Sequence, residues 1–263
     1  MIEKKFLIQK RDGAKLYAVQ YLIHKDSNMD KTKQKPPLVI LCHGFTGGKY
    51  EQGRFPETAK TINQNDMDAL IFDFTGSGEN KREPVRLGQQ RNDLEDVVQW
   101  AVNEQYYQIG VIGLSFGGLT TLVANIPEVK TFVFWAPAFQ IRRNFGLSDK
   151  IMARVKERLR KKPMTFASSG DSDPIMINDG FVEDLINLNP DAFLKKIKIP
   201  TLIIQGTADL TVKPADTRNA FDLIPNDVIH DYIEVDGAGH DFQGEDFRKF
   251  LNHSINWLTR FLE

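Results

Sequence analysis

One short stretch, residues 109–124, constrains what this chain can fold into more than any other. An apolar run of strand length (109–112) leads into the hexapeptide GLSFGG at 113–118, and an apolar segment of helical character follows it. A strand and a helix can meet this closely only when the residues around the turn lack bulky side chains, and glycines stand two residues before and two residues after Ser115. The pattern predicts a sharp turn that holds the Ser115 hydroxyl out of a sheet. A glycine-rich turn with a merely solvated serine would share this local sequence, so the rest of the chain must decide.

The composition is that of an ordinary globular protein. The 263 residues are 41% hydrophobic and 26% charged, which predicts one sizeable core. The 34 basic and 35 acidic residues leave no global charge to attract nucleic acid or an anionic membrane. Cys42 has no second cysteine to pair with, the N-terminus lacks an apolar signal sequence, and no apolar run is long enough to span a bilayer. We therefore expect a soluble, cytoplasmic protein without stable membrane insertion.

Strand-like and helix-like segments alternate along most of the chain. Strands are predicted at 3–9, 14–22, 38–42, 69–74, 109–114, 131–135, 200–205 and 228–235, and helices at about 55–65, 89–104 and 244–262. The first two strands flank Asp12-Gly13, which is typical of a hairpin, and the polar residues 24–35 are expected to form a loop. The later alternation predicts an α/β fold, with a mostly parallel sheet, helices on both faces and a ligand site at the carboxyl ends of the strands.

Residues 139–195 interrupt this alternation. The segment is too long for a simple connection between a strand and the next element of a compact fold. We therefore predict an inserted cap (lid) subdomain at 139–195, with residues 1–138 and 196–263 together forming the core domain.

The predicted cap has two arms of opposite charge. Residues 142–162 contain nine Lys or Arg against Asp149 and Glu157, whereas residues 171–191 contain six Asp or Glu and no Lys or Arg. The arms either attract one another or are simply solvated. The alternative is that the basic arm forms a face that meets anionic substrates or surfaces.

A serine hydroxyl becomes a useful nucleophile only when a base accepts its proton and a third group orients that base. Of the five histidines, His240 is the best candidate for the base, because it lies in the glycine-rich sequence 237–241, just past the predicted strand at 228–235. This placement puts His240 at the ligand-facing edge of the sheet.

The orienting acid should follow another strand, between the serine and the histidine in chain order. Asp209 meets this requirement, since it follows the predicted strand at 200–205. Asp236 and Asp241 are the competing candidates. Their closeness in sequence to His240 makes a contact with its Nδ1 atom awkward, which favours Asp209.

Acyl transfer also requires hydrogen-bond donors for the developing oxyanion. The backbone N–H of Phe45 is one candidate, because His43-Gly44 follows the predicted strand at 38–42 and the glycine lets the chain turn inward. The N–H of Phe116, directly after Ser115, is the other. His43 is interpreted as a structural residue of this loop, and Cys42 as buried packing.

Five motifs together resemble the α/β-hydrolase superfamily from end to end: HGFTG at 43–47, FDFTGSG at 72–78, GLSFGG at 113–118, QGTAD at 205–209 and GH at 239–240. Within it the chain looks most like the bacterial cinnamoyl or feruloyl esterases, on the segment 43–49 and the short cap at 139–195. Asp73 matches a loop-forming aspartate of the superfamily. The chain departs from many relatives at Gln205, where they have histidine, and we expect no effect on the chemistry. The unusually basic arm is a second departure.

The resemblance implies an α/β-hydrolase fold with the cap inserted between strands 6 and 7. It also implies Ser115 as nucleophile, His240 as base and Asp209 as acid, with the amides of Phe45 and Phe116 as the oxyanion hole. No metal and no organic cofactor are needed for this chemistry.

We therefore expect a serine carboxylic ester hydrolase that forms an acyl-enzyme on small esters with an apolar or aromatic acyl group, of the cinnamoyl or feruloyl type. The cap and rim aromatics expected to bind substrate are Phe139, Phe145 and Phe166. An acyl thioesterase or a small-amide hydrolase would use the same three catalytic residues, and a non-catalytic binding protein of this fold is a third alternative. Neither nucleic acid nor a membrane is an expected partner, and the sequence is compatible with a monomer or a homodimer.

Overall fold

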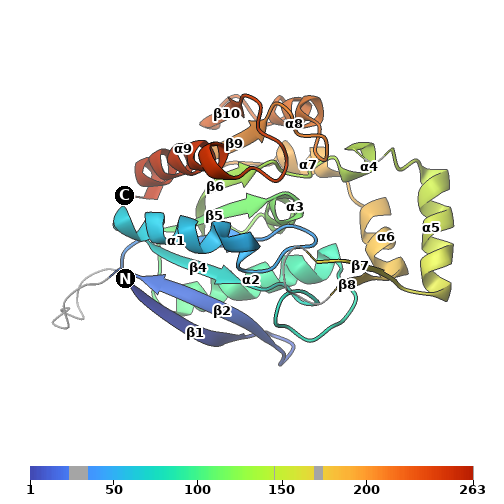
Figure 1. The fold of residues 1–263 in the computed structure, drawn as a ribbon, viewed down its shortest axis with the longest axis horizontal. Helices are drawn as coiled ribbons and strands as arrows, with labels where there is room; N and C mark the ends of the chain where they lie inside the picture. Colours follow the sequence, from blue (N-terminus) through green and yellow to red (C-terminus); the bar gives the residue numbers. More distant parts are fainter. Residues whose placement is uncertain (24–34, 145, 169–173, 263) are drawn as a thin grey trace.

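The computed structural model describes residues 1–23, 35–144, 146–168 and 174–262. Its centre is an eight-stranded sheet with the strand order β1-β2-β4-β3-β5-β6-β9-β10 (Figure 1). The strands are β1 (Ile2–Gln9), β2 (Lys15–Leu22), β3 (Leu38–Cys42), β4 (Asp68–Phe72), β5 (Ile109–Leu114), β6 (Val129–Trp135), β9 (Thr201–Gly206) and β10 (His230–Val235). β2 pairs antiparallel with β1 and β4, and all other neighbours are parallel. The parallel strands therefore end at one common edge of the sheet.

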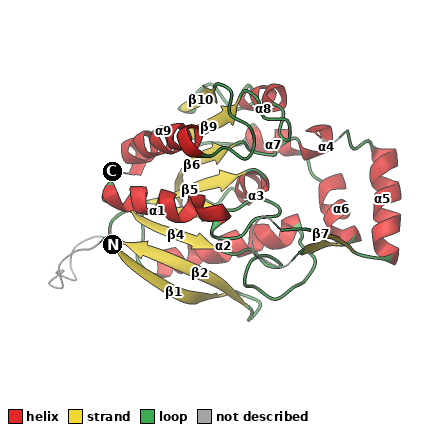
Figure 2. Ribbon diagram, viewed as in Figure 1, coloured by secondary structure: helices red, strands yellow, loops and turns green. Residues whose placement is uncertain are grey.

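Helices cover both faces of this sheet (Figure 2). The helices that flank the sheet are α1 (Arg54–Gln64) and α9 (Gly244–Leu262) on one face, and α2 (Leu87–Asn103), α3 (Phe116–Ala124) and α8 (Pro214–Phe221) on the other. A short 3-10 helix, η1 (Glu51–Gly53), precedes α1. Among the described residues, no helix combines the length and the apolar composition that crossing a membrane requires.

Strand β3 shows why the central strands are continuous apolar runs. Leu38 and Ile40 belong to the apolar cluster under α2 and α3, whereas Val39 and Leu41 belong to the cluster under α1 and α9. All four side chains are fully buried, because successive side chains of a strand point to opposite faces and both faces here are covered.

The predicted strands and helices are present, with small shifts of their ends. The strand predicted at 69–74 ends earlier, at Phe72, because the Asp73 carboxylate accepts hydrogen bonds from the backbone amides of Lys49 (2.7 Å) and Glu79 (3.0 Å). These bonds hold the chain in a loop after β4. The loop predicted at 24–35 lies, except for Lys35, outside the described residues.

In its described residues, the segment between β6 and β9 contains six short elements, most of which lie beyond one end of the sheet (Figure 1), while the last packs against α3 and α8. They are α4 (Ile141–Asn144), α5 (Asp149–Lys161), β7 (Met164–Phe166), β8 (Ile175–Ile177), α6 (Asp179–Ile186) and α7 (Pro190–Leu194). β7 and β8 form a small antiparallel sheet, which the sequence analysis did not predict because three residues are too few for a periodicity. The insertion lies between the sixth and seventh strands of the main sheet, as expected. The exact division into a core domain and a cap at 139–195 stays a prediction.

The oppositely charged arms of this segment meet in one ion pair of the described residues, between Lys156 Nζ and Glu183 Oε1 (3.2 Å). The neighbouring Asp184 instead pairs with Arg86, which precedes α2, at 2.7 Å. The acidic arm therefore also ties the inserted segment to the body of the molecule. Only some of the charged side chains of the two described arms are therefore paired with one another.

The burial of Cys42 leads to a first prediction. The thiol is fully buried at the end of β3, and this burial raises its pKa to about 12. Because the thiolate is the reactive form, we expect no reaction of the folded protein with dithionitrobenzoate at about pH 8, and one equivalent of reaction after unfolding in guanidinium chloride. Rapid labelling in buffer without denaturant would contradict this environment for the thiol.

Candidate active site

Ser115 is the single residue between β5 and α3, and its backbone is strained. Its φ of 52° and ψ of −115° lie in a region that residues other than glycine rarely adopt, at a cost of about 1–3 kcal/mol. Backbone hydrogen bonds hold this conformation: the Ser115 N–H donates to the carbonyl of Trp135 (2.9 Å), and its carbonyl accepts from the amides of Gly118 and Ala138 (both 3.0 Å) and of Leu119 (3.3 Å). The sharp turn predicted from the sequence is therefore present, and β6 supports it.

The glycines around Ser115 are required by close backbone contacts. A Cβ atom on Gly113 would lie 2.7 Å from the Cα of Gly118, and a Cβ on Gly117 would lie 2.3 Å from the carbonyl oxygen of Cys42. Both contacts are with backbone, which cannot move aside as a flexible side chain would. The start of α3 is thus packed directly against the end of β3.

The structure brings Ser115, His240 and Asp209 into one hydrogen-bonded chain. His240 Nε2 lies 3.0 Å from Ser115 Oγ, and His240 Nδ1 lies 2.8 Å from Asp209 Oδ2. Since a carboxylate only accepts hydrogen bonds, Nδ1 carries the proton and the Nε2 lone pair faces the serine hydroxyl. The Asp209 side chain is fully buried, whereas the His240 side chain remains 17% exposed at the cavity.

Asp209 is held by more partners than the sequence analysis foresaw. Its Oδ1 atom accepts from the amides of Thr211 (2.9 Å) and Val212 (2.8 Å), and its Oδ2 atom accepts from Gln205 Nε2 (3.0 Å). Thr217 Oγ1 donates to Gln205 Oε1 at 3.0 Å and so orients the amide. Gln205 therefore contacts Asp209 directly, a contact that the sequence analysis did not predict, and its expected lack of effect on the chemistry stays a prediction. Its position four residues before Asp209, at the end of β9, allows this contact but does not by itself predict it.

The loops after β9 and β10 touch, and this contact joins Asp209 to His240. The Ala208 amide donates to the Ala238 carbonyl (3.0 Å), and that same oxygen lies 2.2 Å from where a Cβ on Gly206 would be. The competing acid Asp236 instead accepts from Thr207 Oγ1 (3.2 Å). The other competitor, Asp241, lines the cavity but is exposed.

The two residues whose amides are expected to bind an oxyanion lie at the cavity that Ser115 lines. Neither the N–H of Phe45 nor that of Phe116 donates a hydrogen bond to a described residue, and both residues line the same cavity as Ser115. His43 is fully buried; its Nδ1 lies 2.8 Å from the Gly44 carbonyl, and its Nε2 accepts from the Phe74 amide (3.1 Å). With both ring nitrogens engaged, His43 fixes the loop after β3, as the sequence interpretation had it.

A cavity of about 680 Å³ opens over Ser115. Phe166 lines it, as expected, and its ring lies 5.7 Å from that of Phe45. The sequence analysis missed further apolar lining residues, of which Phe181 packs on Phe45 at 5.3 Å. The others from the inserted segment are Ile141, Leu147, Ile177 and Leu185. The described residues contain no cluster of three or more His, Cys, Asp or Glu arranged to hold a metal ion.

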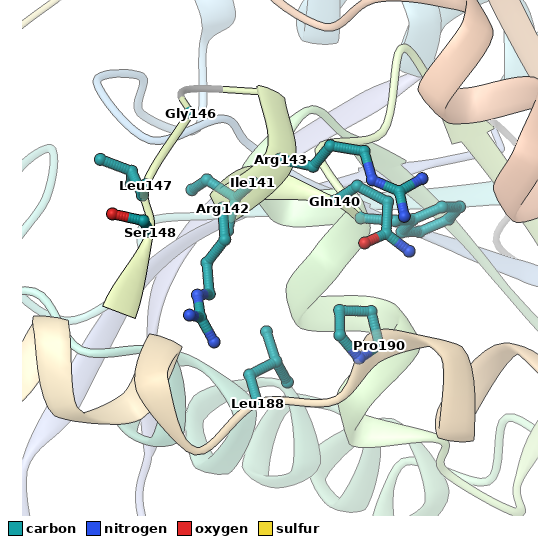
Figure 3. Close-up of a pocket in the computed structure, with 10 residues that line it drawn as sticks. Gln140, Ile141, Arg142, Arg143, Gly146, Leu147, Ser148, Leu188 and Pro190 are labelled. Carbon is teal, nitrogen blue, oxygen red and sulfur yellow. The ribbon is translucent and has the colours of Figure 1, made fainter. Parts of the chain in front are cut away.

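Phe139, expected to bind substrate, does not line this cavity. It is 1% exposed, and its ring packs edge-on against Phe134 in the core at 4.9 Å. It instead borders an adjoining cavity of about 470 Å³ (Figure 3), which shares the side chains of Ile141 and Leu147 with the first. The chain turns after β6, and this directs the Phe139 ring back into the core. The third expected residue, Phe145, lies outside the described residues.

The mostly parallel sheet, the serine at the turn between β5 and α3, and the acid and histidine after β9 and β10 define the α/β-hydrolase fold. The chain belongs to the hydrolase family described as serine aminopeptidase, S33, whose profile matches residues 33–187. The match includes Ser115 and ends before Asp209 and His240.

Similar proteins include esterases and a peptidase. Est1E from Butyrivibrio proteoclasticus, solved with ferulic acid bound, is 22% identical, with a TM-score of 0.74 over 97% of both chains. The α/β hydrolase GrgF from Penicillium sp. sh18 is 19% identical, with a TM-score of 0.76 over 100% of this chain and 99% of that one. Dipeptidyl aminopeptidase BIII from Pseudoxanthomonas mexicana is 26% identical over 93% of this chain but only 36% of the relative. At these identities the solved structures show the shared fold.

The close contact at Gly117 leads to a second prediction. Gly117→Ala would place a methyl group against the Cys42 carbonyl, so we expect a loss of about 2–3 kcal/mol in the free energy of unfolding. Gly239→Ala is the matched control, since nothing lies within 4 Å of the added Cβ. Urea denaturation of both variants measures the difference. Equal stability of the two variants would contradict the packing of α3 against β3.

Proposed function

We propose that this protein is a serine carboxylic ester hydrolase. The observation that carries the proposal is the hydrogen-bonded chain from Asp209 through His240 to Ser115, which borders a mostly apolar cavity. In this arrangement the serine is activated by a base that a buried carboxylate orients, as nucleophilic catalysis requires.

The reaction follows from this geometry. His240 Nε2 accepts the proton of Ser115 Oγ while Oγ attacks the ester carbonyl, and the N–H groups of Phe45 and Phe116 stabilise the negative oxygen of the tetrahedral intermediate. The alcohol leaves with the proton from His240. A water molecule, deprotonated by His240, then attacks the acyl-enzyme; the bond to Ser115 Oγ breaks, His240 returns the proton to Oγ, and the acid is released. Asp209 remains ionised and stabilises the imidazolium in both steps.

The lining of the cavity favours an apolar or aromatic acyl group. Phe45, Phe166 and Phe181 form an aromatic wall over Ser115, and Ile177 and Leu185 extend it. A planar cinnamoyl or feruloyl group would pack well against such rings. The resemblance in fold to Est1E, a structure with ferulic acid bound, supports this substrate class.

A second candidate is an amide hydrolase that acts on aminoacyl or peptidyl substrates. Membership of the serine aminopeptidase family and the similarity to a dipeptidyl aminopeptidase favour it. The same three residues would perform the chemistry, with an amine in place of the alcohol. An acyl thioesterase would likewise differ only in the leaving group.

The experiment compares Ser115→Ala with the wild type on methyl ferulate, an aromatic acyl-CoA thioester and an aminoacyl p-nitroanilide. We expect the wild type to hydrolyse methyl ferulate fastest, and Ser115→Ala to lose about 10⁴-fold or more in kcat because the nucleophile is gone. Circular dichroism should show that the variant remains folded. Undiminished turnover by Ser115→Ala would contradict the proposed nucleophile, and methyl ferulate ranking last would contradict the ester assignment.

The protonation of His240 predicts the pH dependence. The imidazole must be neutral to accept the proton of Ser115, so kcat/KM should rise with pH as the ring loses its proton, within the range of about pH 5 to 8 in which histidines usually titrate. Initial rates in buffers of constant ionic strength measure this profile. A flat profile over that range is the outcome that would exclude His240 as the base.

A further inference from the structure

Glu51 is a buried carboxylate beneath the loop that follows β3. It is 5% exposed, and its Oε1 atom accepts the N–H of Gly44 at 2.7 Å. A Cβ atom on Gly47 would lie only 2.0 Å from the same oxygen. The carboxylate therefore lies directly against the loop that carries Phe45, and it contacts both ends of the 44–47 turn.

The backbone at Glu51 and the two residues after it is strained. Glu51 (φ 41°), Gln52 (φ 56°) and Gly53 (φ 92°) are three consecutive residues with positive φ, and only the third is a glycine. Such conformations persist only where surrounding contacts hold them, and they are frequent at functional sites. Here the Glu51 amide donates to the Gly48 carbonyl (2.9 Å), which closes the turn under the loop.

Arg54 compensates the charge of Glu51. Its NH2 group donates to Glu51 Oε2 at 3.0 Å, both side chains are at least 90% buried, and the guanidinium also lies 5.1 Å from the ring of Phe242. Compensation matters because Glu51 is close to the nucleophile. The position that a Cβ on Gly44 would occupy is 3.6 Å from both Glu51 Oε1 and Ser115 Cβ. An uncompensated carboxylate at this place would oppose the formation of an oxyanion.

We propose that Glu51 is a positioning residue for the oxyanion hole, and that Arg54 keeps its charge from opposing catalysis. The inference rests on the proposed function of Ser115 and the Phe45 amide. Because Glu51 accepts the Gly44 N–H, this amide is turned away from the substrate and the next one, of Phe45, is left to meet the oxyanion. Glu51 and Arg54 also line the cavity, but the Glu51 carboxylate hydrogen-bonds to Gly44 and Arg54 and not to Ser115 or His240, so in this proposal it acts through the Gly44 peptide.

The first test changes the acceptor. Glu51→Gln keeps an oxygen for the Gly44 N–H, whereas Glu51→Ala removes it. We expect Glu51→Ala to lower kcat on p-nitrophenyl butyrate about 10²-fold with little change in KM, and Glu51→Gln to remain within about fivefold of wild type. Glu57→Ala, an exposed glutamate on α1, is the matched control and should be unchanged. Equal losses in Glu51→Gln and Glu51→Ala, or a change in KM alone, would overturn the positioning role.

The second test changes the charge balance between Glu51 and Arg54. A merely structural role of these residues would not explain the recovery expected in the double variant. Arg54→Gln leaves the carboxylate uncompensated and should lower kcat about tenfold or more, and the double variant Glu51→Gln/Arg54→Gln should recover most of that loss. Losses that simply add in the double variant would contradict the electrostatic part of the proposal. If Glu51→Ala fails to fold, the comparison of Glu51→Gln, Arg54→Gln and the double variant still tests the proposal.

A third measurement separates this inference from the substrate assignment. The rate at which a fluorophosphonate labels Ser115 depends on the oxyanion hole whichever acyl substrate is natural, so it should fall in Glu51→Ala and in Arg54→Gln but not in Glu57→Ala. Reduced labelling together with poor ester turnover by the wild type would support the role of Glu51 and contradict the ester assignment. Labelling of all variants at the wild-type rate would overturn the role of Glu51, and absence of labelling in the wild type would overturn both proposals.

Discussion

The close approach of α3 to the end of β3 is the constraint on which the site depends. Gly117 lies against the backbone of Cys42, and this contact leaves no room for any side chain at that position. Ser115 then has to bridge β5 and α3 in a strained conformation, which hydrogen bonds from the β6 side hold in place. Three parallel strands therefore meet around one residue, and the serine hydroxyl is presented at the edge where their carboxyl ends lie.

Parallel topology also explains how residues far apart in sequence come within hydrogen-bond distance. The loops after β9 and β10 start at the same edge of the sheet as the turn at Ser115, and the bond between Ala208 and Ala238 keeps them together. Asp209 and His240 are thus placed by two short loops on a rigid sheet. Hydrogen bonds to the buried carboxylate limit its movement and so keep the imidazole directed at the serine.

The cavity over Ser115 is built from parts with different tasks. The core supplies Ser115, His240 and the loop after β3, which is hydrogen-bonded to His43 on one side and to Glu51 on the other. The inserted segment supplies most of the apolar wall, including Phe166 and Phe181. In the proposed function the core therefore performs the chemistry, and the inserted segment selects the acyl group.

The sequence alone determined the features that arise from local sterics and periodicity. Apolar runs predicted the strands, the glycines around Ser115 predicted the turn, and the positions of Asp209 and His240 after strands predicted where they would lie. These predictions succeed because a strand's burial and a turn's need for glycine are properties of neighbouring residues.

Tertiary structure decided what depends on the direction of individual side chains. Phe139 and Phe166 are both aromatic residues of the inserted segment, yet one packs into the core and the other lines the cavity. Gln205 contacts Asp209, and Glu51 contacts Gly44, although neither role follows from its local sequence. Such contacts depend on which elements pack together and on the rotamers that this packing allows, and no local pattern encodes that information.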